Sequence, residues 1–61
     1  MIKFMTVEEV ADRWRVSRMS IYRLIARKEL EVMRVGRVFR IPETSVDGYE
    51  AANVTSPVEQ G

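Results

Sequence analysis

Apolar residues recur at helical spacing near the start of the chain. They stand at i, i+3, i+4 and i+7, at Val7, Val10, Ala11 and Trp14. This spacing predicts one buried stripe on a helix over residues 7–14. Thr6 directly before the stripe is a favourable N-cap, and Glu9 three residues later completes the capping-box pattern.

A second helical pattern begins only three residues later. Ser17 is again a favourable N-cap, and the next apolar face is formed by Ile21, Leu24, Ile25 and the stem of Lys28. We therefore expect a second helix over residues 18–27. Three connecting residues do not let two helices lie alongside each other, but they suit two helices that cross steeply. This is the helix-turn-helix arrangement.

An alternating pattern follows, with apolar residues at Met33, Val35, Phe39 and Ile41. Alternation on both sides of a Gly36-Arg37 pair predicts a β-hairpin. One register of this hairpin has a two-residue turn at 36–37. It pairs Val35 with Val38 and Arg34 with Phe39.

The other register has a three-residue loop at 36–38. Its pairs are Val35 with Phe39, Met33 with Ile41, and Arg34 with Arg40. We expect this register, because it gives both strands a consistent apolar inner face. It also places Arg34 opposite Arg40 on the outer face, where two like charges destabilise the hairpin unless an anionic group covers them.

The last part of the pattern predicts a short helix and then a tail. Pro42 ends the second strand and can open a helix, on which Val46 and Tyr49 are spaced to rest on the core. Beyond residue 52 the periodicity is lost, so we expect one domain over 1–52 and a flexible tail over 53–61. The predicted fold class is mainly α with a β-hairpin: helix, helix, two-stranded wing and short C-terminal helix, a winged helix-turn-helix.

Composition removes several classes of function. The chain has 61 residues and contains neither cysteine nor histidine, which excludes disulfides, Cys/His zinc sites and thiol or imidazole chemistry. No nucleophile–base pair can be assembled, so we expect a binding protein rather than an enzyme, with no cofactor. No apolar run approaches the roughly 18 residues of a membrane span, and we expect a cytoplasmic protein without a membrane partner.

The charge is unevenly distributed along the chain. The net charge is +1, but residues 13–40 hold nine basic residues against Glu29 and Glu31, while both ends of the chain are acidic. Eight of the ten basic residues are arginine, whose planar fork suits phosphate and guanine. The basic middle therefore predicts a nucleic-acid partner, although a solvated charged surface would have the same composition.

Two basic surfaces are candidates for contact with double-stranded DNA. The outward face of the second helix carries Arg18, Met19, Tyr22, Arg23 and Ala26, with no acid among them. Arg18 lies in the first turn, where a cation gains nothing from the helix dipole, so an anionic ligand explains it better. The hairpin tip is the second surface, because a wing can place an arginine in a minor groove. The candidate DNA-binding residues are Ser17, Arg18, Met19, Ser20, Tyr22, Arg23, Arg27, Arg34, Gly36, Arg37 and Arg40.

The sequence resembles a known family in these same segments. Residues 6–11 and 16–25 are similar to the two helices of the excisionase-type, MerR-like winged helix-turn-helix family, and residues 34–42 are similar to its wing. The short chain most resembles excisionases of actinobacterial phages. The resemblance implies a recombination directionality factor that binds attachment-site DNA head to tail, bends it and helps a tyrosine integrase to excise a prophage. It also implies that Arg18, Tyr22 and Arg23 meet the major groove and Arg37 the minor groove.

Two departures from the family pattern and two alternative functions stay open. Arg15 stands where the family usually has glycine, and Phe39 stands where it usually has tryptophan. If residue 15 requires a positive φ, the arginine bears strain of about 1 kcal/mol. A small MerR-like transcriptional regulator would need the same DNA-binding face. A protein-interaction module would instead need an exposed apolar patch.

Overall fold

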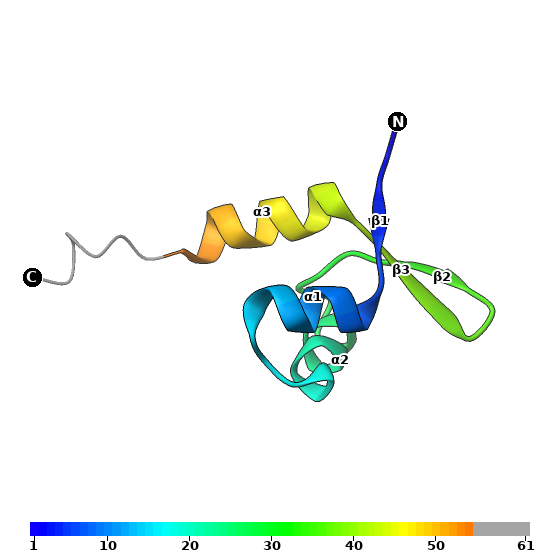
Figure 1. The fold of residues 1–61 in the computed structure, drawn as a ribbon, viewed down its shortest axis with the longest axis horizontal. Helices are drawn as coiled ribbons and strands as arrows, with labels where there is room; N and C mark the ends of the chain where they lie inside the picture. The colour runs from blue at the N-terminus through cyan, green and yellow to red at the C-terminus, as the bar shows by residue number, and fades with distance from the viewer. Residues whose placement is uncertain (55–61) are drawn as a thin grey trace, which may run out of the picture.

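The computed structural model describes residues 1–54 and has the predicted winged helix-turn-helix architecture (Figure 1). Its elements, in chain order, are β1 (Phe4–Met5), α1 (Val7–Trp14), α2 (Arg18–Ala26), β2 (Met33–Val35), β3 (Val38–Pro42) and α3 (Glu43–Asn53). The hairpin of β2 and β3, which we call the wing, extends away from the helices, and α3 leaves in the opposite direction. The predicted tail lies outside the described residues, except that Asn53 still belongs to α3 and Val54 caps it.

Helix α1 begins and ends where the sequence predicts. The Thr6 hydroxyl accepts the Glu9 backbone N–H at 3.0 Å, and the Thr6 N–H donates to the Glu9 carboxylate at 2.9 Å. These two bonds satisfy backbone groups that a helix N-terminus leaves without partners. The predicted capping box is therefore confirmed.

The turn after α1 depends on a left-handed residue. Arg15 has φ 55° and ψ 47°. Its N–H donates to the Asp12 carbonyl at 3.2 Å, and the Val16 N–H donates to the Ala11 carbonyl at 2.9 Å. This pair of bonds is the Schellman ending, in which glycine is the usual left-handed residue. Residue 15 therefore does require a positive φ, and Arg15 adopts it in place of the usual glycine.

Helix α2 ends in the same way, at a residue for which the sequence pattern predicts continued helix. Lys28 has φ 61°. Its N–H donates to the Ile25 carbonyl at 3.0 Å, and the Glu29 N–H donates to the Leu24 carbonyl at 2.9 Å. The expected helix over 18–27 is therefore one residue too long. Lys28 lies after the helix and does not continue its apolar face.

The expected register of the wing is wrong. The pairs are Met33 with Arg40, Arg34 with Phe39, and Val35 with Val38. The turn therefore has two residues, and Gly36 has φ 61° in its first position, as a type II′ hairpin turn requires. Such a turn matches the natural twist of two strands, and this local gain decides the register.

The apolar side chains of the wing do not share an inner face. Met33, Val35 and Val38 are all exposed, at 45%, 53% and 47%. The register places these three side chains on the face opposite to Phe39, and the wing extends away from the helices. The predicted opposition of Arg34 and Arg40 is wrong as well, since these two arginines point to opposite faces of the hairpin.

A third strand precedes α1. In β1, Phe4 pairs with Pro42 and Met5 pairs with Ile41, which gives an antiparallel sheet in the order β1-β3-β2. Two residues are too few for an alternating pattern to reveal a strand in the sequence. The strand joins the start of the chain to the end of the wing.

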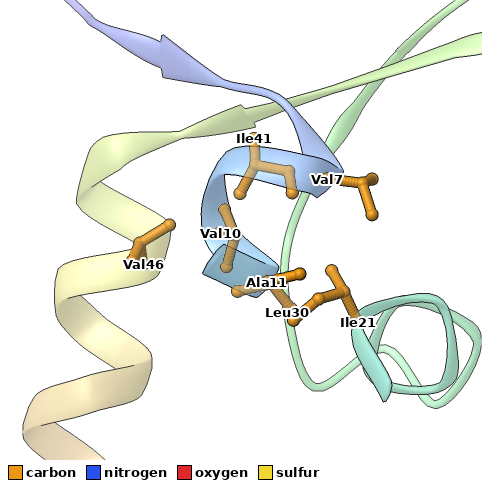
Figure 2. Close-up of a cluster of buried hydrophobic side chains, with 7 residues drawn as sticks. All are labelled: Val7, Val10, Ala11, Ile21, Leu30, Ile41 and Val46. Carbon is orange, nitrogen blue, oxygen red and sulfur yellow. The ribbon is translucent and has the colours of Figure 1, made fainter. Parts of the chain in front are cut away.

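All three helices, strand β3 and one connecting residue contribute to a core of seven buried side chains (Figure 2). They are Val7, Val10 and Ala11 from α1, Ile21 from α2, Leu30, Ile41 from β3, and Val46 from α3. The predicted stripe of α1, the predicted stripe of α2 as far as Ile25, and the predicted burial of Val46 are confirmed. Leu30, in the connection between α2 and the wing, was not anticipated.

Polar contacts fasten α3 to the end of α1. The Trp14 indole N–H donates to the Glu50 carboxylate at 2.6 Å, and Arg13 donates to both oxygens of the same carboxylate, each at 2.9 Å. The Trp14 and Tyr49 rings lie 5.1 Å apart. We call Arg13, Trp14 and Glu50 the α1–α3 clamp. The indole hydrogen bond and then the guanidinium hydrogen bond lower the pKa of Glu50, and the Glu50 hydrogen bond raises the pKa of Arg13.

The clamp should make stability fall in acid. Because the pKa of Glu50 is lower in the folded protein, Glu50 contributes fully to folding stability above the ordinary glutamate pKa of about 4.3. The contribution is lost as the pH falls through the lowered value. Unfolding followed by the fluorescence of Trp14 should show this loss, and Glu50→Gln should remove that part of the acid dependence. If the variant and the wild type lost stability in parallel, the clamp would not be responsible.

Replacing Arg15 should stabilise the fold. Arg15→Gly relieves a left-handed conformation that costs a non-glycine residue about 1 kcal/mol, so thermal unfolding should shift upward by about 4–8 °C for a domain of this size. Arg27→Gly is the matched control, because Arg27 has φ −82° and bears no such strain. The control should lower the unfolding temperature. A lower temperature for Arg15→Gly would contradict the prediction.

Candidate DNA-binding surface

The outward face of α2 is arranged as the sequence predicts. Ile21 is fully buried, and Leu24 and Ile25 pack against the core. The opposite side of the helix is exposed and carries Arg18, Met19, Tyr22, Arg23 and Ala26. We call these five residues the α2 face. Its long side chains are free to reach a ligand without disturbing the core.

One acid lies close to this face. The Arg18 guanidinium is 3.8 Å from the Glu8 carboxylate, and both side chains are well exposed. Helix α2 itself places no acid on the α2 face, as expected. Glu8, however, approaches this face from the first turn of α1. An exposed pair at this distance contributes at most about 1 kcal/mol. Arg18 is therefore weakly paired within the protein and remains able to turn toward an anionic ligand.

Two candidate residues have structural roles at the start of α2. The Ser17 hydroxyl accepts the Ser20 backbone N–H at 3.3 Å, as expected of an N-cap, and the two hydroxyls lie 3.3 Å apart. These contacts account for both serines without a ligand. The two serine hydroxyls also lie near Arg18 at the N-terminus of α2, which is the positive end of the helix dipole.

Arg23 lies at the edge of the α2 face, and Arg27 lies next to it, one turn further along the helix. Together with Trp14, Leu24 and Tyr49 they line an open hollow between α2 and the α1–α3 clamp. Arg27 lies 3.8 Å from the exposed Glu29 carboxylate. Within residues 1–54, no ion pair or hydrogen bond involves the side chain of Arg23. Arg23 is thus the most available cation of the α2 face.

The three arginines of the wing have different surroundings. Arg37 is exposed at the tip, next to Gly36. Arg40 is exposed on the outer face of the hairpin, paired across the strands with Met33. Arg34 lies on the other face, where its Nε donates to the Gly36 carbonyl at 3.1 Å and its guanidinium carbon lies 5.9 Å from the centre of the Phe39 ring.

An aromatic contact joins the α2 face to the wing. The rings of Tyr22 and Phe39 lie 6.0 Å apart at an angle of 58°, a tilted arrangement that aromatic pairs favour. Phe39 was predicted as a core residue, and it does pack against the core while also touching Tyr22. The contact was not visible in the sequence, because it depends on the register of the wing. It makes the α2 face and the wing neighbours on one side of the molecule.

Not every basic residue of the middle segment belongs to this surface. Arg13 is held by Glu50 and also lies 3.4 Å from Asp47, so its charge is neutralised inside the α1–α3 clamp. Within residues 1–54 there is no group of acidic residues that could hold a metal ion. No helix in that range is long and apolar enough to cross a membrane.

Comparison with known proteins points to the same fold. The chain matches a helix-turn-helix domain family over residues 4–53. It is 45% identical over 47 residues to a Saccharopolyspora erythraea protein named "Probable excisionase", and the alignment covers 77% of this chain and 48% of that protein. It is 48% identical over 44 residues to a Mycobacterium tuberculosis protein named "Putative DNA-binding protein", with 72% of this chain and 56% of that protein covered.

The chain spans about half the length of the curated relatives it matches. No solved structure matches it significantly. The family match nevertheless covers both helices, the wing and α3, which are the elements that form and support the basic surface. The protein therefore belongs to the helix-turn-helix domain family.

Proposed function

We propose that the protein binds double-stranded DNA sequence-specifically, with α2 in the major groove and the wing in the adjacent minor groove. One observation carries the proposal: the exposed, arginine-bearing face of α2 adjoins a hairpin with Arg37 at its tip. A recognition helix meets base edges through its N-terminal residues, and a wing arginine suits the negative potential of a narrow minor groove. Arg18, Tyr22 and Arg23 would contact the major groove. A DNA partner also fits the cytoplasmic location expected from the sequence.

The more specific proposal is a role in DNA excision. The identity of 45% to a protein named as a probable excisionase supports it. In this role the protein would bind attachment-site DNA, bend it, and direct a tyrosine integrase toward excision, without itself acting as an enzyme. Insertion of the wing into a minor groove favours such a bend. A small transcriptional regulator is the second candidate, since the relatives of Mycobacterium tuberculosis are named only for DNA binding.

The charge layout supports assembly on DNA in a head-to-tail manner. Helix α1 exposes acids such as Asp12, whereas the wing exposes arginines. An acidic surface of one copy could then meet a basic surface of the next, a contact that does not close into a two-fold dimer. Adjacent copies would occupy direct repeats about 10 bp apart, so that each faces the same side of the DNA.

Binding should depend on Arg23 and on salt. If Arg23 makes a fork to guanine, Arg23→Ala should weaken binding by about 1–3 kcal/mol and relax the preference at one base pair. Arg37→Ala should weaken binding with little change in that preference. For wild type, the logarithm of the affinity should fall with the logarithm of salt concentration by about 0.9 per phosphate contacted. A slope near zero in a mobility-shift titration would contradict DNA binding itself.

Removing Glu8 should strengthen binding. Glu8→Gln releases Arg18 from its nearby carboxylate and removes a negative charge close to the DNA, so affinity should rise about twofold to fivefold at low salt. The gain should shrink as salt increases. On DNA with a single site, where no neighbouring copy binds, Asp12→Asn is the matched control, because Asp12 is an exposed acid on the same helix without a side-chain partner among residues 1–54. An equal gain in both variants would assign the effect to overall charge.

Assembly can be tested apart from affinity. The free protein should sediment as a monomer. DNA with two direct repeats should bind it more tightly than two independent sites with the affinity measured on single-site DNA. A stable free dimer that prefers an inverted repeat would contradict the head-to-tail arrangement and favour the transcriptional regulator.

A further inference from the structure

Arg34 differs from the other arginines of the wing because its side chain is held by the protein itself. Its Nε donates to the Gly36 carbonyl at 3.1 Å, and its guanidinium lies over the Phe39 ring, 5.9 Å from the centre. Among residues 1–54 neither Arg37 nor Arg40 has an ion pair, a side-chain hydrogen bond or an aromatic partner. The three arginines carry the same charge, but only the side chain of Arg34 is held by contacts within the protein.

These contacts form a chain from α2 to the tip of the wing. Tyr22 on the α2 face touches Phe39, Phe39 lies directly opposite Arg34 in the hairpin, and Arg34 binds the carbonyl of the first turn residue. The next residue is Arg37. The geometry of the tip is thereby connected, through two side chains, to the helix that is proposed to enter the major groove.

Little else supports the tip. Val35 and Val38, the pair next to the turn, are both about half exposed, and no heavy atom outside residues 35–37 lies within 4 Å of the position that a Gly36 Cβ would occupy. Two-stranded hairpins are only marginally stable in water without packing on one face. The angle between the wing tip and α2 therefore depends on the contacts that Arg34 and Phe39 make.

We propose that Arg34 is a positioning residue, which braces the wing so that Arg37 meets the DNA at a fixed distance from the contacts of α2. This inference rests on the proposed DNA binding and deepens it. A preorganised tip avoids the loss of conformational freedom that an unbraced wing would suffer on binding. In this role Arg34 acts through Arg37, beyond any contribution of its own charge.

A matched pair of variants separates bracing from charge. Arg34→Met and Arg40→Met each remove one positive charge from the wing, but only the first removes the hydrogen bond to Gly36. Each is combined with Arg37→Ala, and binding to the same DNA is titrated. In the Arg34→Met background, the loss caused by Arg37→Ala should shrink by about threefold or more, the size of coupling expected for residues in one network. In the Arg40→Met background it should stay as in wild type.

The outcomes distinguish the inference from the function on which it rests. If the losses from Arg34→Met and Arg37→Ala simply multiply, Arg34 acts independently of Arg37 and the positioning role is overturned. If wild-type protein shows no salt-dependent DNA binding, the proposed function itself fails.

A measurement without DNA tests the brace directly. In the free protein, ¹⁵N relaxation should show lower backbone order at residues 35–38 in Arg34→Met than in wild type, and no such change in Arg40→Met. Far-UV circular dichroism of both variants should match wild type, because neither side chain is in the core. Equal order at the tip in the two variants would overturn the bracing role, whatever the DNA titration gives.

Discussion

The left-handed conformation at Arg15 is the constraint on which the rest of the structure depends. It ends α1 in a Schellman motif and reverses the chain within three residues, so that α2 crosses α1 instead of lying along it. That crossing buries Ile21 beside Val10 and Ala11 and leaves the opposite side of α2 exposed. A binding surface and a core are thus produced by one turn. The residue in this conformation is an arginine. Its backbone strain is small compared with the stabilisation from the apolar side chains that the crossing of α1 and α2 buries.

A chain without cysteine must stabilise its small core by other means. The seven buried side chains come from all three helices, from β3 and from one connecting residue, so the removal of any one helix or of β3 would open the core. The α1–α3 clamp adds the Glu50 carboxylate, which accepts three hydrogen bonds from Arg13 and Trp14. Charged acceptors of this kind form the stronger class of hydrogen bond. The clamp also explains why Arg13 belongs to the fold and not to the basic surface.

Local signals predicted most of the fold, and contacts between distant residues account for what was missed. The capping box at Thr6, the stripe of α1 and the outward face of α2 follow from neighbours along the chain, so the sequence alone predicts them. The wing register was mispredicted because an apolar inner face was assumed, whereas the wing extends past the core and its turn geometry decides. The strand β1 and the approach of Glu8 to Arg18 arise only when separate segments meet.

The register also decides what the arginines of the wing can do. A three-residue loop would place Arg34 and Arg40 side by side on one face, where mutual repulsion would make an anionic ligand the natural explanation of both. The actual two-residue turn separates them and gives Arg34 a neighbouring aromatic ring and a backbone carbonyl. The repulsion is removed within the protein, so it no longer argues for DNA. The case for a DNA-binding wing then rests on Arg37 at its tip and on the contact between Tyr22 and Phe39, which sets the wing beside the α2 face.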